Sequence, residues 1–419
     1  MCTAVSIIIP THNPRREYLA RTLEALKRQT LAPDKWELVV VDNKSEDIGF
    51  RILDIVRDSG VKGLGGLGSS KSESEKRKAE KPPPAISDLP FAPSVRVVRE
   101  NKLGLTHARV RGFQEAQGEI VVMVDDDNVL KADYLERAME ILEKNPRLGA
   151  IGGKALPEFE IEPPEWLKGR SSGLGLRDLG DLKIVYPVFD GQRSEVGGQK
   201  SEGRKNKAES EKRKAERGRV RRKVAEFPEC APIGAGMVIR REAALEYVAR
   251  IQELMGESVA SGGSRVAGGQ KSEVGGRSSF ATSPSGGAAS EDKRKGKAIV
   301  TDRKGKSLAS GGDNDICLTA LEHGWGVGYF PDLELTHLIP KERMTVEYQC
   351  RMARDAMRSY IVMLDQHRIR PWLPISRWSV PLRVARAWWR DKPWKGVQGH
   401  LNFQNAVGQF LGRADIGAM

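Results

Sequence analysis

Cysteine is scarce in this chain of 419 residues, and its spacing excludes two kinds of structural cross-link. The residues Cys2, Cys230, Cys317 and Cys350 lie far apart, and no pair of them shows CxxC spacing. This distribution argues against both a zinc site and a disulfide framework, and it suits a reducing compartment.

Long hydrophobic runs are also missing. No stretch reaches the roughly 18 consecutive apolar residues that a transmembrane helix needs. The N-terminus leads directly into an apolar, β-branched segment and has no basic region of the kind that opens a signal peptide. We therefore predict neither a signal peptide nor a transmembrane helix, and we expect a cytoplasmic protein.

Acidic residues are outnumbered, which gives a formal net charge of +13. Much of the excess lies in three short basic runs, at residues 204–207, 212–214 and 219–223. A basic protein can bind nucleic acid or an anionic membrane, but no nucleic-acid-binding signature accompanies these runs. The charge therefore predicts no nucleic-acid partner and is better explained by inserted segments.

Three low-complexity segments interrupt the chain, at about residues 63–90, 193–223 and 257–300. They share phrases: Ser-Glu-Val-Gly-Gly begins at positions 194 and 272, and Glu-Lys-Arg-Lys-Ala-Glu begins at 75 and 211. Irregular intervals exclude a solenoid, whose repeat period is fixed. We interpret the segments as insertions into surface loops, because loop closure costs only about 0.6 kcal/mol per doubling of length. Arms that bind something anionic are the alternative.

Outside the insertions, apolar strand-like segments alternate with amphipathic helical ones. Strands are predicted at residues 5–9, 36–41, 95–98 and 120–124, and helices at 18–30, 106–116 and 132–144. This alternation predicts an α/β fold with a mostly parallel central sheet flanked by helices. The later part of the chain adds short strands at 150–153 and 326–330 and helices at 241–254 and 345–364.

Three adjacent carboxylates, Asp125, Asp126 and Asp127, follow the apolar run Ile120–Val124. In open α/β sheets, ligands bind outside the carboxyl ends of the strands. Three like charges this close raise one another's pKa unless a cation lies among them, and Mg²⁺ or Mn²⁺ with substrate phosphate oxygens fits that demand. The alternative is a solvated acidic turn that caps a helix beginning near Ala132.

Six phrases together resemble the inverting glycosyltransferases of family 2, which have the GT-A fold. They occur in the family's order between residue 5 and about residue 340, outside the insertions. The phrases are Val5-Ser-Ile-Ile-Ile-Pro-Thr-His-Asn13, Leu38-Val-Val-Val-Asp-Asn-Lys-Ser45, Asn101-Lys-Leu-Gly-Leu-Thr-His-Ala-Arg109, Val124-Asp-Asp-Asp127, Gly234-Ala-Gly-Met-Val238 and Gly311-Gly-Asp-Asn-Asp-Ile-Cys317. The resemblance implies a GT-A catalytic domain over residues 1–345, followed by a helical C-terminal extension over 346–419.

The resemblance also implies roles for individual residues at the donor site. Asp42 would contact the base of the nucleotide, Asp126 the ribose, and Asp127 a metal ion bridging the diphosphate. His337 matches a histidine that completes the metal shell in some relatives, although a lone histidine after a strand is more often structural. The implied donor-binding residues are Pro10, Thr11, Asn13, Asp42, Arg109, Asp125 and Asp126.

The general base is the remaining role. Asp313 matches the family's catalytic aspartate, which removes the proton of the acceptor hydroxyl as it attacks the anomeric carbon. The family usually has glutamate before this aspartate, whereas this chain has Gly312. Asp315 is therefore a second candidate, although it could equally favour the start of a helix.

The resemblance implies a hexosyltransferase that moves a sugar from a nucleotide-diphosphate donor to a hydroxyl acceptor, with inversion and with Mn²⁺ or Mg²⁺. UDP is the default nucleotide, and a glycan, a lipid-linked molecule or another hydroxyl compound is the acceptor, as in polysaccharide biosynthesis. Two alternatives stay open. One is a nucleotidyltransferase, although the loop after the first strand lacks a Gly-rich phosphate motif. The other is a catalytically degenerate protein that binds sugar nucleotides.

The C-terminal region combines tryptophan with basic residues. Between Trp378 and Lys395 there are four tryptophans and several arginines and lysines. One interpretation is an interfacial helix that touches anionic lipid at the inner face of a membrane through residues 378–410. The other is a helix packed on the catalytic domain with a solvated polar face.

Overall fold

The computed structural model covers most of the chain outside the predicted insertions. It describes residues 3–46, 94–171, 173–187, 227–256 and 310–418, together with residues 54 and 308. The predicted insertions at 63–90, 193–223 and 257–300 lie outside the described residues.

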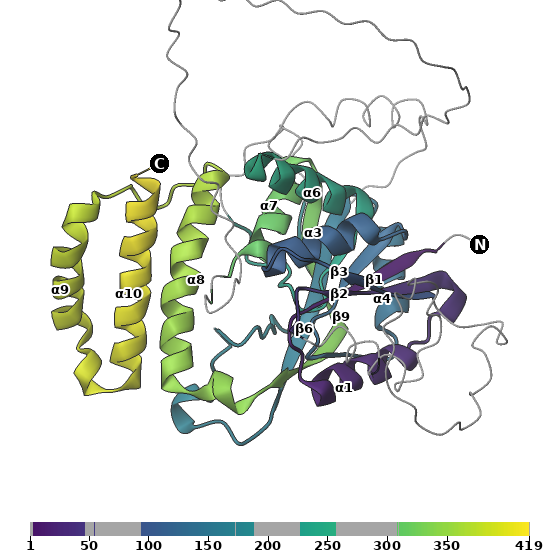
Figure 1. The fold of residues 1–419 in the computed structure, drawn as a ribbon, viewed down its shortest axis with the longest axis horizontal. Coiled ribbons are helices and arrows are strands. Elements are labelled where there is room, and N and C mark those ends of the chain that lie inside the picture. Colours follow the sequence, from purple (N-terminus) through teal and green to yellow (C-terminus); the bar gives the residue numbers. More distant parts are fainter. Residues whose placement is uncertain are drawn as a thin grey trace, which may run out of the picture.

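One sheet forms the centre of the part of the molecule before the C-terminal helices (Figure 1). Within the described residues it has nine strands. These are β1 (Val5–Thr11), β2 (Trp36–Asp42), β3 (Ser94–Arg99), β4 (Ile120–Met123), β5 (Asn128–Leu130), β6 (Leu148–Phe159), β7 (Ile184–Tyr186), β8 (Val238–Arg240) and β9 (Gly326–Ile339).

The strand order is β3-β2-β1-β4-β8-β6-β9-β5, and β7 also pairs with β9. The first four strands are parallel, as the alternation of strands and helices predicts. Beyond them, β8 runs antiparallel to both of its neighbours, and β5 and β7 run antiparallel to β9. The sheet is therefore mixed: one parallel part joins β3, β2, β1 and β4, and a second parallel pair joins β6 with β9.

Eight α-helices and five short 3-10 helices are found in the described residues. The α-helices are α1 (Arg16–Lys27), α3 (Leu105–Glu115), α4 (Tyr134–Lys144), α6 (Arg241–Met255), α7 (Gly312–Glu322), α8 (Val346–Gln366), α9 (Val380–Asp391) and α10 (Val397–Ile416). The 3-10 helices are η1 (Pro33–Lys35), η3 (Glu165–Leu167), η4 (Lys341–Met344), η5 (Arg377–Ser379) and η6 (Pro393–Lys395). No helix in the described ranges is long and apolar enough to cross a bilayer.

Helices cover both faces of the sheet, and strand β1 shows how the two layers are divided. Its Ile7 and Ile9 belong to the core beneath α1 and α4, whereas Ile8 belongs to the core beneath α3, α6 and α7. Successive side chains of a strand point to opposite faces, so a strand buried on both sides reads as a continuous apolar run. This explains why the predicted strand at residues 5–9 has no polar alternation.

The C-terminal helices stand side by side, with α10 between α8 and α9 (Figure 1). A small apolar core joins α9 and α10, in which Phe403 and Phe410 of α10 meet Ala387 of α9. On the other side of α10, Ile416 packs with Ile361 of α8. Because α8 also contributes Met363 to the core between the sheet and helices α3, α6 and α7, it connects the C-terminal helices to the sheet.

Three elements differ from the sequence-based expectation. Strand β1 continues through Pro10 to Thr11, which is tolerated because pairing with β4 already ends at Ile8 and Met123. Strands β6 and β9 are much longer than the predicted short strands at 150–153 and 326–330. The acidic triplet is followed by strand β5 rather than directly by a helix.

Candidate active site

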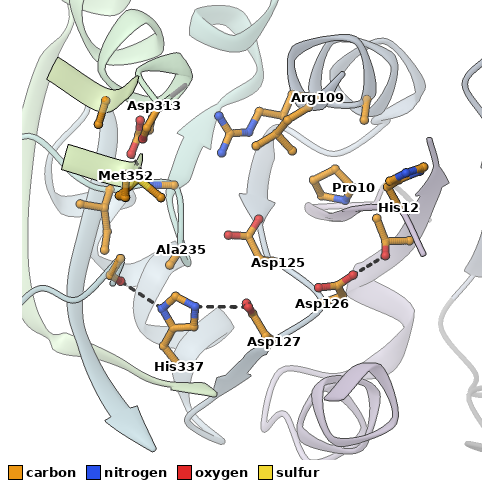
Figure 2. Close-up of a pocket in the computed structure, with 18 of the residues that line it drawn as sticks. Pro10, His12, Arg109, Asp125, Asp126, Asp127, Ala235, Asp313, His337 and Met352 are labelled. Atoms are coloured by element: carbon orange, nitrogen blue, oxygen red, sulfur yellow. Dashed lines mark hydrogen bonds and ion pairs between the residues drawn. The ribbon is translucent and has the colours of Figure 1, made fainter. Parts of the chain in front are cut away.

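A cavity of about 590 Å³ opens at the carboxyl ends of β1 and β4. Its wall combines the ends of these strands with the first turns of α3 and α7 and with the region around β9 and η4 (Figure 2). Most of the predicted site residues lie in this wall: Pro10, Thr11, Arg109, Asp125, Asp126, Asp127, Asp313 and His337. Acidic groups that are distant in sequence therefore meet in a single cleft.

The acidic triplet forms the turn between β4 and β5. The backbone amide of Asn128 donates to the carbonyl oxygen of Asp125 at 3.1 Å, and the side-chain oxygen of Asn128 accepts from the Asp125 amide at 3.0 Å. Helix α4 begins later, at Tyr134, and its N-cap residue Asp133 makes no capping hydrogen bond. The triplet therefore does not cap a helix, which removes the alternative explanation for it.

Asp126 faces the end of β1, where it accepts a hydrogen bond from the hydroxyl group of Thr11. Burial raises the pKa of Asp126 to about 7, and the neighbouring charges of Asp127 and Asp125 act in the same direction. The Thr11 hydrogen bond opposes this shift only in part. The carboxylates are thus crowded enough to favour a bound cation in the cavity.

Asp127 is buried, with 5 % of its surface exposed, and its Oδ2 atom contacts two basic side chains. Arg343 donates to Oδ2 from Nη2 at 2.9 Å, and Nε2 of His337 lies 3.3 Å from the same oxygen. Asn128 donates to the other carboxylate oxygen at 3.0 Å. Burial works against the charge of Arg343, but Asp127, and more weakly Asp125 and Asp126, raise the pKa of its guanidinium overall.

The contacts of His337 assign its tautomer. Nδ1 lies 3.1 Å from the carbonyl oxygen of Gly175, and Nε2 lies 3.0 Å from Nη1 of Arg343. A guanidinium group only donates and a carbonyl only accepts, so these two hydrogen bonds place the proton on Nδ1 and the lone pair on Nε2. The 3.3 Å between Nε2 and Asp127 Oδ2 is then a close approach and not a hydrogen bond. Metal-binding histidines are commonly oriented in this way, with the second ring nitrogen held by a carbonyl or a carboxylate (Figure 2).

Asp127 and His337 fit two positions of a divalent-ion shell. Ligands of an octahedral ion that lie about 2.1 Å from it are about 3 Å apart when adjacent, close to the 3.3 Å between Asp127 Oδ2 and His337 Nε2. Among the described residues, no group of three or more His, Cys, Asp or Glu side chains is arranged to hold a metal. The protein would thus supply few ligands, and water and substrate oxygens the rest, as is usual for Mg²⁺.

Asp313 lies in the first turn of α7, across the cavity from the acidic triplet (Figure 2). Its Oδ2 accepts a hydrogen bond from the backbone amide of Gly234 at 3.0 Å. Arg109 is almost fully buried in α3, and Figure 2 shows its side chain reaching into the cavity between Asp313 and Asp125. Asp313 therefore has an anchored carboxylate that borders the space available to substrate.

Asp315, the second candidate base, faces away from the cavity. Two residues along a helix differ by about 200° in direction, so Asp313 and Asp315 point to opposite sides of α7. Asp315 is buried, and its Oδ1 lies 2.7 Å from His367 Nε2 and 3.1 Å from Arg250 Nε. Its side chain belongs to a buried ionic network, which explains its position without a catalytic role.

Asp42 and Asn13, two predicted donor contacts, lie beside the cavity rather than in its wall. Asp42 is buried at the end of β2, where its carboxylate accepts from the Ser45 amide at 3.0 Å and lies 3.5 Å from Arg99. Asn13 is exposed, and its backbone amide donates to the Ser45 hydroxyl at 3.0 Å. Both residues stabilise the loops after β1 and β2, because each forms a hydrogen bond with Ser45.

Several lining residues were not predicted from the sequence. Asn43 follows Asp42 and joins two loops, since its Nδ2 donates to the Lys102 carbonyl at 2.8 Å and its Oδ1 accepts from the Gly104 amide at 2.8 Å. The motif around residues 38–45 contains Asn43, so its role could have been suspected. No sequence motif pointed to Arg343, because it lies in a polar turn that matches none of the six phrases.

Comparison with known proteins identifies the family. Residues 6–60 and 85–245, together more than half of the chain, match the family described as "Glycosyl transferase family 2". The chain belongs to glycosyl transferase family 2. This membership confirms the resemblance drawn from the six motifs, and with the mixed sheet and flanking helices it confirms the α/β architecture of the GT-A type. Family membership also sets the nucleotidyltransferase alternative aside.

Two curated relatives of this family 2 chain act in the chemistry of lipid-linked sugars, according to their names. A glucosyl-dolichyl phosphate glucuronosyltransferase of Haloferax volcanii is 25% identical over 163 residues, which are 39% of this chain and 41% of that protein. A dolichol-phosphate mannosyltransferase of Pyrococcus furiosus is 28% identical over 203 residues, which are 46% of this chain and 47% of that protein. The matches span less than half the length of either relative.

A solved structure shows a more distant similarity. The mannosyltransferase PcManGT from Pyrobaculum calidifontis, determined in complex with GDP-Man and Mn²⁺, has 16% sequence identity and a TM-score of 0.42 to this chain. The alignment covers 97% of this chain and 74% of PcManGT.

Proposed function

We propose that the protein transfers a sugar from a nucleotide-diphosphate donor to a hydroxyl acceptor, with inversion at the anomeric carbon. The observation that carries this proposal is that Asp313 and the acidic triplet border one cavity from opposite sides (Figure 2). A transferase of this kind needs a cation-binding group for the departing diphosphate and a base for the incoming hydroxyl. The cavity offers both in a space large enough for substrate.

The nucleotide would lie along the ends of β1 and β2. Thr11, Asn43 and Arg109 line that side of the cavity and offer a hydroxyl, an amide and a guanidinium group. Asp126 lies beside Thr11, where it would face the ribose. These contacts do not select one nucleobase over another, so UDP is the default nucleotide for the first experiments.

The diphosphate would lie against Asp127 and His337, which would hold Mn²⁺ or Mg²⁺. Such an ion acts as a Lewis acid and neutralises charge on a departing diphosphate, which is worth several kcal/mol. The fit rests on the lone pair of His337 Nε2 and on the spacing of this atom from Asp127 Oδ2.

Asp313 would act as the general base. The acceptor oxygen attacks the anomeric carbon as the bond from that carbon to the diphosphate oxygen breaks, and the hydroxyl proton passes to the Asp313 carboxylate. A single displacement of this kind inverts the anomeric centre. The hydrogen bond from the Gly234 amide orients the carboxylate.

A second hollow, of about 290 Å³, continues from the cavity and is our proposed acceptor site. The two share Ser310, Asn314 and Met352, and the hollow extends between α8 and α10 to Asn402. The side chains of Asn314 and Asn402 suit hydroxyl groups, and Met352 suits the apolar faces of a sugar ring. The names of the curated relatives favour a lipid-linked acceptor.

Peripheral membrane contact is the last part of the proposal. Trp378 and Trp389 are 94% and 72% exposed on the C-terminal helices, and Leu382 is 60% exposed. Six arginines and lysines but only one acidic residue lie between residues 377 and 395. Exposed tryptophan beside basic side chains is typical of proteins that rest on an anionic bilayer surface. We call residues 373–395 the tryptophan face.

The central experiment measures hydrolysis of several sugar nucleotides in the presence of Mn²⁺, with water in place of the unidentified acceptor. Asp313→Asn should lower the turnover at least about 100-fold while UDP or GDP still binds, because only proton transfer is lost. Asp332→Asn is the matched control: the same chemical change on an exposed residue of β9 should leave turnover unchanged.

The same experiment separates catalysis from mere binding. Mass spectrometry of the products identifies which sugar nucleotide is consumed, and calorimetry records nucleotide binding by each variant. Binding by the wild type without turnover of any donor would support the catalytically degenerate alternative. Equal turnover by the wild type and Asp313→Asn would remove Asp313 as the base.

A further inference from the structure

Arg343 occupies the space between the two proposed metal ligands. Its Nη2 donates to Asp127 Oδ2 at 2.9 Å, and its Nη1 donates to His337 Nε2 at 3.0 Å. The side chain is largely buried, with 19% exposure, and it belongs to η4, the short turn after β9. One guanidinium group thus bridges the carboxylate and the imidazole.

These two contacts use the same atoms that a divalent ion would use. The Nε2 atom of His337 has one lone pair, which cannot bind a metal while it accepts a hydrogen bond from Arg343. An ion placed beside Asp127 would also meet the positive guanidinium at short range, where like charges repel strongly in a buried site. Arg343 and the ion are therefore competitors for one position.

We propose that Arg343 is an internal counter-cation that fills the divalent-ion position in the donor-free protein and leaves it when the ion binds. This inference rests on the metal dependence included in the proposed function. It explains how the side chains of Asp127 and His337 are kept in place before the substrate arrives. It also means that a divalent ion alone binds weakly, since it must first displace an arginine that is already hydrogen-bonded.

The displaced guanidinium has a suitable new partner. Arg343 lines the same cavity as Thr11 and Asp127, so the diphosphate of a donor bound there would lie close to the guanidinium group. Guanidinium groups bind phosphate oxygens in a bidentate manner. Donor and ion would consequently favour each other's binding. The ion takes the hydrogen-bond acceptors of Arg343, and the phosphate oxygens of the donor replace them.

The test measures the affinity for Mn²⁺ without any nucleotide, by isothermal titration calorimetry of the full chain. Arg343→Gln should bind Mn²⁺ at least about tenfold more tightly than the wild type, since the competing charge-assisted hydrogen bonds are gone. Adding Asp127→Asn to Arg343→Gln should abolish this gain. Arg343→Met, which is also uncharged, replaces the Gln variant if that variant does not fold.

Arg15→Gln is the matched control. Arg15 is also a cation at this turn, because its guanidinium lies 2.5 Å from Glu342, but its partners Glu160 and Glu342 are outside the cavity wall. The control should leave the affinity for Mn²⁺ unchanged. A similar gain in Arg15→Gln would show that general surface charge, and not Arg343, weakens ion binding.

The outcomes separate this inference from the proposed function. If the wild type binds Mn²⁺ as tightly as Arg343→Gln, or more tightly, Arg343 is not a competitor and the inference is overturned, while metal dependence stands. If neither protein binds Mn²⁺, even with UDP or GDP present, the metal dependence itself fails. A gain in Arg343→Gln that needs Asp127 supports the inference.

Discussion

Gly175 shows how one residue positions His337, the proposed metal ligand. Its φ of +69° lies in the left-handed region, which favours glycine, and its carbonyl oxygen accepts from His337 Nδ1. A Cβ atom built on Gly175 would lie 2.9 Å from Cε1 of His337. Any side chain here would therefore displace the imidazole ring, and with it the lone pair of Nε2.

We predict that Gly175→Ala weakens use of the metal. Changes to a residue that orients a metal ligand typically cost 10- to 100-fold in affinity. The Mn²⁺ concentration that gives half-maximal donor hydrolysis should therefore rise about tenfold or more. Gly169→Ala is the control, because Gly169 has a similar φ of +73° and an added Cβ would meet nothing within 4 Å.

Both variants should lose about 1 kcal/mol of stability from the left-handed backbone. Thermal unfolding measures this loss, and the Mn²⁺ dependence of hydrolysis measures the specific effect. An unchanged Mn²⁺ requirement in Gly175→Ala would argue against His337 as a ligand.

At this scale, motifs made part of the site predictable. Asp127 and Asp313 stand in recognisable phrases, so their meeting in one cavity could be expected from the sequence. Which way Asp315 points could not be read from its type, although the 100° step of a helix already separates it from Asp313. Arg343 was not predictable, because its role depends on the path of the chain after β9 and on no local pattern.

At the scale of elements, a buried ionic network joins α6, α7 and the end of α8. His367 lies 2.7 Å from Asp315 and 2.9 Å from Glu322, and Arg250 of α6 lies 3.1 Å from Asp315. Burial disfavours the charged imidazole, but hydrogen bonds to Asp315 and Glu322 raise the pKa of His367 overall. Burial likewise opposes the charge of Asp315, yet His367 and Arg250 lower its pKa.

The signs of these shifts predict how stability depends on pH. The pKa of His367 is raised above its ordinary value of 6.5, so its contribution is complete below pH 6.5 and is lost as the pH rises through the folded-state pKa. The pKa of Asp315 is lowered below 3.8, so the stability that its carboxylate contributes is complete above pH 3.8, where His367 titrates. This contribution is lost only as the pH falls through the folded-state pKa of Asp315.

We therefore expect His367→Gln to lower the free energy of unfolding more at pH 6 than at pH 9. Removing one partner of a buried ion pair costs about 3–5 kcal/mol, and this cost should shrink as His367 of the wild type loses its proton. Urea unfolding at several pH values measures the difference. His400→Gln, on half-buried His400 of α10, is the control and should show no such trend. A cost independent of pH would mean that the charged imidazole does not stabilise the helices.

The elements themselves were predicted unevenly. Strands and helices in the first half were clear because their apolar runs are short and bounded. Strand β6 contains Gly152, Gly153 and Pro157, all weak strand formers, and its pairing with β9 shifts register twice. Its full length depends on the partner strand, which lies more than 160 residues further along the chain and leaves no local signal in the sequence.

At the scale of the whole molecule, the three C-terminal helices place the tryptophan face on the outer side of the extension. Trp388 and Trp394 are packed against each other, with ring centroids 5.5 Å apart, and Trp388 also meets Phe403 of α10 at 5.2 Å. The two most exposed tryptophans are Trp378 and Trp389, and Trp389 meets the edge of Trp394 with ring centroids 5.8 Å apart. Part of the tryptophan face is thus structural, and part is available for contact.

We predict that the tryptophan face binds anionic vesicles. The wild type should sediment with vesicles that contain phosphatidylglycerol, and Trp378→Ala combined with Trp389→Ala should lose most of this binding because interfacial anchoring by indole rings is gone. Raising the ionic strength should weaken what remains, since basic side chains act through screened charge. Leu182→Ala, at a residue 79% exposed elsewhere, is the control. Equal sedimentation of all proteins would refute the contact.

The pairing of β5 with β9 places Asn128 opposite His337, more than 200 residues later in the chain. During synthesis, the acidic turn after β4 therefore exists long before the imidazole and guanidinium that complete its surroundings. A nascent chain that ends before residue 343 lacks the guanidinium that pairs with Asp127, and one that ends before residue 337 lacks the imidazole as well. The cavity wall is therefore complete only after β9 and η4 have joined the structure.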